Sequence, residues 1–391
     1  MGKDYFSEAV RKHREWAGKL EVRVRVPLEN MEDLSYAYTP GVAAPCLEIN
    51  KNPSSSFELT RRSNTVAVIT DGTAVLGLGD IGPEAGMPVM EGKCAIFKCF
   101  AGIDAIPLCL KTKDTDEIVR IIHMLSGSFG GINLEDIASP RCFEIEEKLR
   151  KLCDIPVFHD DQHGTAIVTG AALLNALRLT DRKLDGVNIA INGAGAAGIS
   201  IAELLFDLGA KNITMAASAG ILCDGDKMKN PAHAKIAKRT NRAGLRGSLA
   251  DAMKGADVFI GVSVANVVTK EMVKSMAANP VVLAMANPVP EISMQAAIEA
   301  GAAVVGTGSS AEPNQVNNAL IFPGIFRGAL DSGAKDINME MRIAACHALA
   351  GIISDGELKP DYIIPSVFDA RVVPAVAEAT KKAAVESKIC R

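Results

Sequence analysis

The order of hydrophobic and polar positions changes along the chain and is most regular after residue 155. There, short runs of Val, Ile, Leu and Ala alternate with segments whose apolar residues recur every three or four positions. The runs predict buried strands and the spaced segments predict helices. We expect strands at residues 155–158, 187–191, 212–217, 257–261, 281–286 and 303–308, and helices at 163–179, 200–208, 231–239, 270–277 and 294–300. This alternation is typical of an α/β fold with a doubly wound, Rossmann-type parallel sheet that helices cover on both faces.

The first 150 residues predict a separate, mixed α/β N-terminal unit. Strands are expected at 66–70, 94–99 and 105–110, and helices at 114–124 and 141–151. A long glycine-rich loop is expected from Asp71 to Gly92, and residues 1–30 are charged and are expected to be helical. After Pro323 the pattern is helical to the end. We therefore divide the chain into an N-terminal domain (1–155), a Rossmann-type domain (156–325) and a helical segment that packs back on the body (326–391).

Composition narrows the classes of function. The chain has 42 basic and 46 acidic residues, for a net charge of −4, so neither nucleic acid nor a membrane surface is an expected partner. None of the nine cysteines forms a C-x-x-C pair, which argues against a zinc ribbon or a dithiol motif. With an odd number of cysteines and no visible signal peptide or membrane span, we expect free thiols and a cytoplasmic location.

A glycine-rich loop between a predicted strand and a predicted helix has the G-x-G-x-x-G spacing of dinucleotide-binding proteins. Its glycines permit a tight turn, close approach of backbone to a pyrophosphate, and close packing of the helix on the strand. A glycine-rich turn in an ordinary α/β domain is the alternative. The candidate cofactor-binding residues are Gly193, Ala194, Gly195, Ala196, Ala197 and Gly198.

The end of the next predicted strand bears on which dinucleotide is bound. NAD-binding proteins place an acidic residue about 20 positions after the loop, where it binds the ribose 2′-hydroxyl. Here the strand ends in Ala216-Ala217-Ser218, without a carboxylate. Ser218 could bind a 2′-phosphate and Lys227 or Lys229 could neutralise it, so we expect NADP, with use of both NADP and NAD as the close alternative.

Two acidic pairs lie in loops on either side of the expected junction between the first two domains. Glu135 and Asp136 form one pair, and Asp160 and Asp161 follow a predicted strand. Hard oxygen ligands of this kind suit Mg²⁺ or Mn²⁺. The neighbouring His159 and His163 make zinc an alternative, and helix capping by the aspartates is another.

Other polar residues stand at positions that suit a ligand site. Lys93 follows the glycine-rich loop and could act as a general base if burial lowers its pKa. Asn287 follows a predicted buried strand, at the edge where α/β sheets bind ligands. Asn314, Asn317 and Asn318 lie close together and could bind carboxylate or amide groups, although turns and caps also use asparagine. Taken alone, Tyr36 and Tyr38 would be packing residues.

Together these segments resemble the malic enzyme family in its short, prokaryotic-type form, from about Tyr36 to Ala350. The resemblance lies in an ordered series of motifs: Tyr38-Thr39-Pro40-Gly41, Thr70-Asp71-Gly72, Gly77-Leu78-Gly79-Asp80-Ile81-Gly82, Glu91-Gly92-Lys93, Leu134-Glu135-Asp136, residues 159–166 (HDDQHGTA), the loop at 193–198, Asn287-Pro288, Asn317-Asn318 and Phe322-Pro323-Gly324.

The resemblance implies an activity and a role for each residue. The family oxidatively decarboxylates L-malate to pyruvate and CO2 and reduces NAD(P)⁺, with Mg²⁺ or Mn²⁺. By this resemblance Glu135, Asp136 and Asp161 would hold the metal, and Lys93 would take the proton of the C2 hydroxyl. Asp160 would tune Lys93, and Tyr38 would protonate the enol carbon. Asn287 and Asn318 would position malate and the nicotinamide, and a homodimer is expected.

The chain departs from the family in two places. Short forms often carry Gly-Arg-Ser-Asp before Pro-Asn-Gln, where this chain has Gly308-Ser309-Ser310-Ala311-Glu312-Pro313. Long eukaryotic forms have a substrate-binding arginine where this chain has Ala74, and a basic residue from a partner subunit is one possible replacement. Two alternatives stay open: a malolactic or related 2-hydroxy acid decarboxylase, and a silent dinucleotide-binding sensor.

Overall fold

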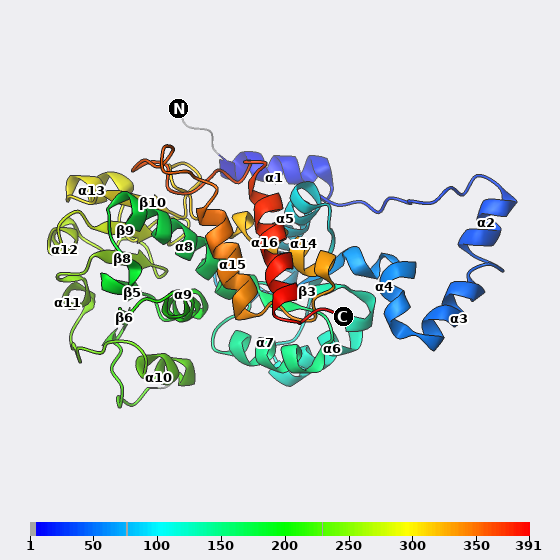
Figure 1. Ribbon diagram of the computed structural model, residues 1–391, viewed down its shortest axis with the longest axis horizontal. Helices are drawn as coiled ribbons and strands as arrows, with labels where there is room; N and C mark the ends of the chain where they lie inside the picture. The colour runs from blue at the N-terminus through cyan, green and yellow to red at the C-terminus, as the bar shows by residue number, and fades with distance from the viewer. Residues whose placement is uncertain (1–4, 76, 229) are drawn as a thin grey trace.

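The computed structural model describes residues 5–75, 77–228 and 230–391, which form two parallel sheets joined by a buried helix, with an N-terminal arm at one end (Figure 1). The first sheet has the strand order β2-β1-β3-β4, and all of its strands are parallel. Its strands are β1 (Thr65–Thr70), β2 (Asp104–Cys109), β3 (Gly131–Leu134) and β4 (Val157–His159).

Two groups of helices cover the two faces of this sheet. Alternate residues of β1 point to opposite sides, so Val66 and Val68 pack in one hydrophobic cluster and Ala67 and Ile69 in another. The first cluster includes α5 (Pro83–Ala101) and α14 (Phe322–Ser332), and the second includes α6 (Thr115–Leu125) and α7 (Arg141–Leu152). Burial on both faces explains why β1 reads as a continuous apolar run.

The second sheet has the order β10-β9-β8-β5-β6-β7, parallel except for the short antiparallel edge strand β7. The order reverses beside β5, which is where open α/β sheets bind ligands. This arrangement confirms the predicted Rossmann-type fold. Its strands are β5 (Asn188–Asn192), β6 (Asn212–Ala217), β7 (Gly220–Ile221), β8 (Val258–Gly261), β9 (Val281–Ala284) and β10 (Val304–Thr307); its helices are α9 (Ala196–Asp207), α10 (Pro231–Ala237), α11 (Leu249–Met253), α12 (Lys270–Lys274) and α13 (Met294–Glu299).

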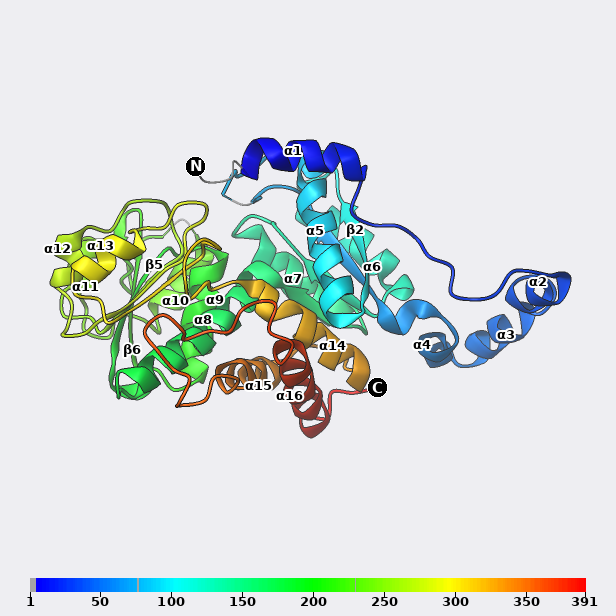
Figure 2. The ribbon, with the colours of Figure 1, turned by 90° about the horizontal axis from the view of Figure 1, so that it is seen from above.

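Helix α8 (Asp160–Leu179) joins the two sheets and is buried along most of its length. It begins directly after β4 and packs on β9, α9 and α15 (Met339–Ala350). Helices α14 and α15 in turn pack on α16 (Val372–Glu386), so the C-terminal helices return to the body (Figure 2). The division into domains at residues 155 and 325 stays a prediction. Strand β4 follows the first boundary in sequence but pairs in the first sheet.

One predicted strand is wrong. Residues 94–99 belong to the helix α5. The glycine-rich loop, which was expected to run to Gly92, ends at Gly82, because Pro83 begins this helix. The apolar run from Cys94 to Phe100 fits either structure by periodicity. Helical spacing is visible once the run is extended backward, since the buried residues of α5 are Gly86, Met90, Lys93, Cys94 and Phe97.

The N-terminal segment also differs from its expectation. Only α1 (Tyr5–Trp16) is helical within residues 5–30, and the chain then continues without regular structure to α2 (Met31–Ala37) and α3 (Ala43–Lys51). Helices α2 and α3 project from the body, and the short α4 (Ser56–Leu59) returns to it (Figures 1 and 2). No helix in the described ranges combines the length and apolarity needed to cross a bilayer.

An aromatic cluster ties α14 to the first sheet. The Phe326 ring lies 5.3 Å from that of Phe97 and 5.8 Å from that of Phe158, and Phe97 lies 4.7 Å from Phe322. All four side chains are buried.

We expect Phe326→Ala to lower the free energy of unfolding by about 3–5 kcal/mol, because it leaves a cavity among rings that cannot collapse. Urea denaturation measures the change. Met124→Ala, at an exposed site on α6, is the control, and an equal effect of both substitutions would contradict this account.

Candidate active site

The candidate site lies at the carboxyl ends of β3 and β4. Because the two strands are parallel neighbours, the residues that follow them meet at one edge of the sheet. Glu135 and Asp136 follow β3, and Asp160 and Asp161 open α8 directly after β4. Helix α5 supplies Lys93 from its buried face, opposite these carboxylates. The site thus gathers side chains from three elements that are distant in sequence.

Lys93 is buried and held by two carboxylates. Its Nζ lies 3.0 Å from Glu135 and also donates to Asp160, and it sits 3.8 Å from the centre of the Phe322 ring. Burial alone would lower the pKa of Lys93, but the carboxylates of Asp160 and Glu135 outweigh it and raise this pKa above its ordinary value. The lowered pKa expected for a general base is therefore not found, since the two carboxylates favour the ammonium form of Lys93.

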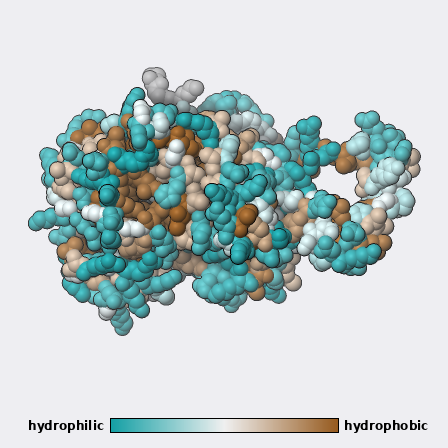
Figure 3. Space-filling model, in the orientation of Figure 1, coloured by the Kyte–Doolittle hydropathy of each residue, from teal (hydrophilic) through white to brown (hydrophobic). Residues whose placement is uncertain are grey.

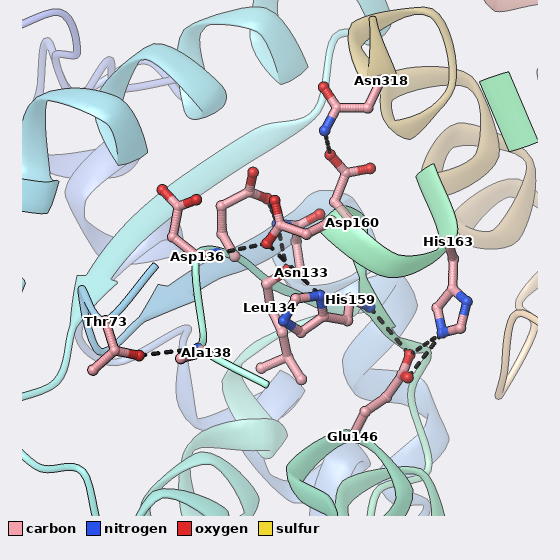
Figure 4. A network of polar contacts seen from close by, with 12 residues as sticks. Thr73, Asn133, Leu134, Asp136, Ala138, Glu146, His159, Asp160, His163 and Asn318 are labelled. Carbon is pink, nitrogen blue, oxygen red and sulfur yellow. Dashed lines mark hydrogen bonds and ion pairs between the residues drawn. The ribbon is translucent and has the colours of Figure 1, made fainter. Parts of the chain in front are cut away.

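The first turn of α8 is shaped to accept the Asp160 carboxylate. A Cβ atom at Gly164 would lie 1.9 Å from Asp160 Oδ1 and 3.3 Å from the Cβ of Asn318, so only glycine leaves room for the carboxylate. The side-chain amide of Asn318 donates to Asp160 from the other side (Figure 4). The spacing of Asp160 and Gly164 thus has a steric reason, and Asp160 holds both Lys93 and Asn318.

Glu135, Asp136 and Asp161 form the described group that could bind a metal ion. One carboxylate oxygen from each lies within 4.8 Å of the other two. The Asp161 carboxylate accepts a hydrogen bond from the Asp136 backbone N–H at 2.8 Å (Figure 4). Burial and then the charges of Asp161 and Glu135 raise the pKa of Asp136 to about 9, and its Oδ2 is buried without a partner.

This donor set fits a divalent cation. Four carboxyl groups face a single lysine here, and their burial and then their crowding raise the pKa of Asp136, Glu135 and Asp160. An all-oxygen set with an orphaned oxygen suits Mg²⁺ or Mn²⁺ better than zinc. His159 and His163, which made zinc an alternative, are not part of the described three-residue cluster.

His163 belongs instead to a buried network behind the site that the sequence did not suggest. Glu146 of α7 accepts from His163 Nε2 at 2.8 Å, and Arg342 of α15 lies 2.9 Å from His163 Nδ1 (Figure 4 shows the Glu146 contact). Because arginine can only donate, Nδ1 must be the acceptor and Nε2 carries the proton. Burial and then Arg342 lower the pKa of His163 to about 4, so the imidazole is neutral.

The same network fixes the junction of β4 and α8. Glu146 also accepts from the His159 backbone N–H at 3.1 Å. A second unforeseen pair lies across the site, where Arg141 contacts Asp71 at 2.7 Å. No sequence signal links His163 to Arg342, 179 positions apart. The acidic and basic residues on helices α7 and α15 would pass for solvent-exposed charges.

The glycine loop has the geometry of a pyrophosphate site. Gly193 has φ +108°, and a Cβ there would lie 2.5 Å from the Val262 carbonyl oxygen. A Cβ at Gly198 would lie 1.8 Å from the Gly193 carbonyl oxygen. At Gly195, in contrast, a Cβ would meet no described atom within 4 Å, and α9 begins at the next residue. The loop therefore leaves open space in front of a helix N-terminus, as a bound phosphate requires.

The remaining predicted site residues have separate outcomes. Asn287 is exposed in the loop after β9, and Ser218 is exposed at the turn between β6 and β7. Asn314 is structural, since it bonds the backbone of Val305, Pro360 and Ile363. Lys229 lies outside the described residues. Tyr38 follows α2 on the projecting arm, is 67% exposed, and is not brought to Lys93, since α2 stands apart from α5 (Figures 1 and 2).

A Rossmann-type sheet with this loop, joined to a lysine–carboxylate cluster, defines a nicotinamide-dependent oxidoreductase. Residues 17–150 match the family model "Malic enzyme, N-terminal domain" and residues 162–385 match "Malic enzyme, NAD binding domain". The chain therefore belongs to the malic enzyme family.

Individual relatives support the same assignment. The chain is 55% identical to the bifunctional malic/malolactic enzyme of Bacillus subtilis, covering 98% of this chain and 94% of that protein. It is 49% identical to the NADP-dependent malic enzyme of Haemophilus influenzae over 95% of this chain but only 51% of that protein, about half its length. The solved NAD-dependent malic enzyme of Thermotoga maritima matches with a TM-score of 0.92 and 47% identity, covering 95% of this chain and 98% of that one.

We expect Mn²⁺ to stabilise the protein through the carboxylate cluster. At 100 times its dissociation constant, a ligand that binds only the folded state adds about 2.7 kcal/mol to the free energy of unfolding. Asp136→Asn should remove most of this gain without destabilising the metal-free protein, because Asn tolerates the φ of +54° found there. Thermal or urea unfolding with and without Mn²⁺ measures both effects. Asp116→Asn, at an exposed site on α6, is the control, and full stabilisation of Asp136→Asn would exclude this site.

Proposed function

We propose that the chain oxidatively decarboxylates L-malate to pyruvate and CO2 with reduction of NADP⁺ or NAD⁺, using Mg²⁺ or Mn²⁺. The observation that carries the proposal is the buried Lys93 between Asp160 and Glu135, where Glu135 also belongs to the carboxylate cluster. The reaction balances with malate giving one hydride to the nicotinamide and one carboxylate as CO2. Family membership supports this activity.

In this proposal Glu135, Asp136 and Asp161 hold the cation, and the glycine loop holds the dinucleotide. The bound cation supplies Lewis acidity at the malate oxygens, where negative charge develops on loss of CO2. Lys93 takes the proton of the C2 hydroxyl through Nζ. Asp160 positions Lys93, and Asn318 positions Asp160. Asn287 is exposed and follows the carboxyl end of β9, and it would position malate or the nicotinamide.

The roles assigned to Lys93 and its neighbours depend on charge. Asp160 and Glu135 raise the pKa of Lys93 and so favour its ammonium form. A positive charge among Glu135, Asp136 and Asp161 offsets the same carboxylates that raise the pKa of Lys93. Proton uptake by Lys93 is thereby coupled to occupancy of the cluster, because Glu135 contacts both.

The main test is formation of NADPH or NADH with L-malate and Mn²⁺, with and without a chelator. Pyruvate should be the product. Lactate without net cofactor reduction would instead indicate the malolactic reaction, in which no hydride leaves with the cofactor. If neither cofactor is reduced and neither product forms, the proposal is wrong and a dinucleotide-binding sensor becomes the better explanation.

We expect Lys93→Ala to lower kcat about 100- to 10,000-fold, the contribution typical of a positioned general base. Binding of NADP⁺, followed by calorimetry, should be unchanged because Lys93 lies outside the glycine loop. Lys98→Ala is the matched control, since Lys98 lies on the same helix, is exposed and pairs with Asp104. Normal turnover by Lys93→Ala would refute its role as the base.

We further propose that the chain prefers NADP. The relatives include both NAD- and NADP-dependent malic enzymes, so the support comes from β6. That strand ends at Ala217 without a carboxylate, and Ser218 is exposed at the turn that follows. Neither the described end of β6 nor Ser218 carries a carboxylate that would repel a 2′-phosphate.

We expect Ala217→Asp to shift the preference toward NAD, because a carboxylate at the end of β6 binds the ribose hydroxyls and repels a 2′-phosphate. The ratio of kcat/KM for NADP⁺ to that for NAD⁺ measures the shift and should fall at least tenfold. Ala217→Asn, which has the same size without the charge, separates the electrostatic effect from the steric one. An unchanged ratio in Ala217→Asp would count against this account.

A further inference from the structure

Glu291 has a fully buried carboxyl group at the edge of the Rossmann-type sheet where ligands bind. The residue follows the carboxyl end of β9 and is 0% exposed. Figure 3 shows hydrophobic residues gathered over the part of the body where Figure 1 places β8, β9 and β10. A carboxyl group buried in such surroundings is stable only where hydrogen bonds replace its lost hydration. The partners of Glu291 therefore decide which parts of the site it connects.

Two neighbouring strand ends supply the hydrogen bonds of this carboxyl group. Ser263, after β8, donates its backbone N–H to Glu291 Oε1 at 2.8 Å and its hydroxyl to the same oxygen at 3.2 Å. Ala286, after β9, donates its backbone N–H to Oε2 at 3.0 Å. Gly261, the last residue of β8, leaves the necessary space, since a Cβ there would lie 2.5 Å from the carboxyl carbon of Glu291. Each carboxyl oxygen thus accepts from a different loop.

Through Ser263 these hydrogen bonds reach the dinucleotide loop. Asn192, the residue directly before Gly193, donates its side-chain amide to Ser263 Oγ at 2.7 Å. The Val262 carbonyl oxygen lies against Gly193, where a Cβ would approach it to 2.5 Å. The position at which the loop begins is therefore set by the segment that Glu291 holds.

Through Ala286 the same carboxyl group reaches Asn287, the next residue in the chain. The Asn287 carbonyl oxygen lies against Gly77 in the glycine-rich loop of the first 150 residues, where a Cβ would approach it to 2.7 Å. The turn after β9 thus meets the part of the chain that supplies Lys93. Glu291 lies between the loop that would hold the dinucleotide and the turn that faces the lysine–carboxylate cluster.

We propose that Glu291 is a positioning residue of this active site and sets the distance between the dinucleotide loop and Asn287. The inference rests on the proposed function, in which the loop holds the pyrophosphate and Asn287 positions malate or the nicotinamide. Hydride transfer needs its two carbons about 3–3.5 Å apart, and an error of about 1 Å can slow a reaction about 100-fold. A carboxylate suits this role because it has an acceptor oxygen for each loop, whereas a glutamine would turn its NH2 group toward one of the N–H donors.

Kinetics of Glu291→Gln test the role, because this change keeps the size of the side chain and removes one acceptor. We expect kcat to fall about 10- to 100-fold, while the dissociation constant of NADP⁺, measured by calorimetry, changes less than about threefold. Asp257→Asn is the matched control, since Asp257 accepts from the Asn188 backbone N–H at 2.9 Å at the opposite edge of the same sheet, and its kcat should equal that of wild type. An unchanged kcat in Glu291→Gln, or a loss of NADP⁺ affinity as large as the loss of kcat, would overturn the proposal.

If circular dichroism shows that Glu291→Gln does not fold, Ser263→Ala decides instead. This change removes the hydroxyl that joins Asn192 to Glu291 but keeps the backbone N–H that Glu291 accepts. The kcat of Ser263→Ala should fall severalfold, again with NADP⁺ affinity kept. A wild-type kcat in the folded Ser263→Ala protein would then overturn the proposal.

The fluorescence of bound NADPH tests the positioning without malate. Its anisotropy decay follows the motion of the nicotinamide, which in wild type and in Asp257→Asn should move only with the whole protein. In Glu291→Gln we expect an added fast decay on the picosecond to nanosecond timescale, because Asn287 no longer lies at a fixed distance from the loop. A wild-type decay in Glu291→Gln would contradict the proposal. If wild type fails to oxidise malate while the fast decay appears in Glu291→Gln, the proposed function fails and the positioning role stands.

Discussion

The contact of a buried lysine with two buried carboxylates is the interaction on which the site depends. Lys93 can stay charged inside the protein only because Asp160 and Glu135 lie against it. Those carboxylates come from different strands, so β3 and β4 must be neighbours and α8 must begin directly at the sheet edge. Gly164 then leaves space for Asp160, and Asn318 holds it from the far side.

Sequence patterns predicted most of the fold because most elements are buried in regular ways. The strands of the Rossmann-type domain are runs of Val, Ile and Ala covered on both faces, which is a strong signal. Helix α5 was mistaken in part for a strand because its buried face includes Lys93, a charge that interrupts the apolar spacing. Strand β3 was not predicted, since Gly131–Leu134 has four residues and includes a polar one, Asn133. That short strand nevertheless positions Glu135 and Asp136.

The candidate site was predictable to the extent that its residues follow strands. Glu135, Asp136, Asp160 and Asp161 lie together because parallel strands end at one edge. The supporting network of Glu146, His163 and Arg342 could not be foreseen, because it depends on the C-terminal helix α15 returning to the N-terminal sheet. The position of Tyr38 in the fold could not be predicted either, because the motif that contains it indicates a local turn and says nothing of where the arm lies.

The carboxylates of the site affect two properties at once, the pKa of Lys93 and the binding of a cation. The carboxylates that hold Lys93 in place also raise its pKa, because their charges favour the ammonium form. Asp136 shows the same conflict from the acid side, since its neighbours raise its pKa to about 9. One positive charge bound between Glu135, Asp136 and Asp161, as proposed, would relieve both conflicts. Base strength at Lys93 and binding of the cation are then two consequences of the same carboxylate cluster. A substitution of Glu135 must disturb both, whereas a substitution of Asp160 acts first on Lys93.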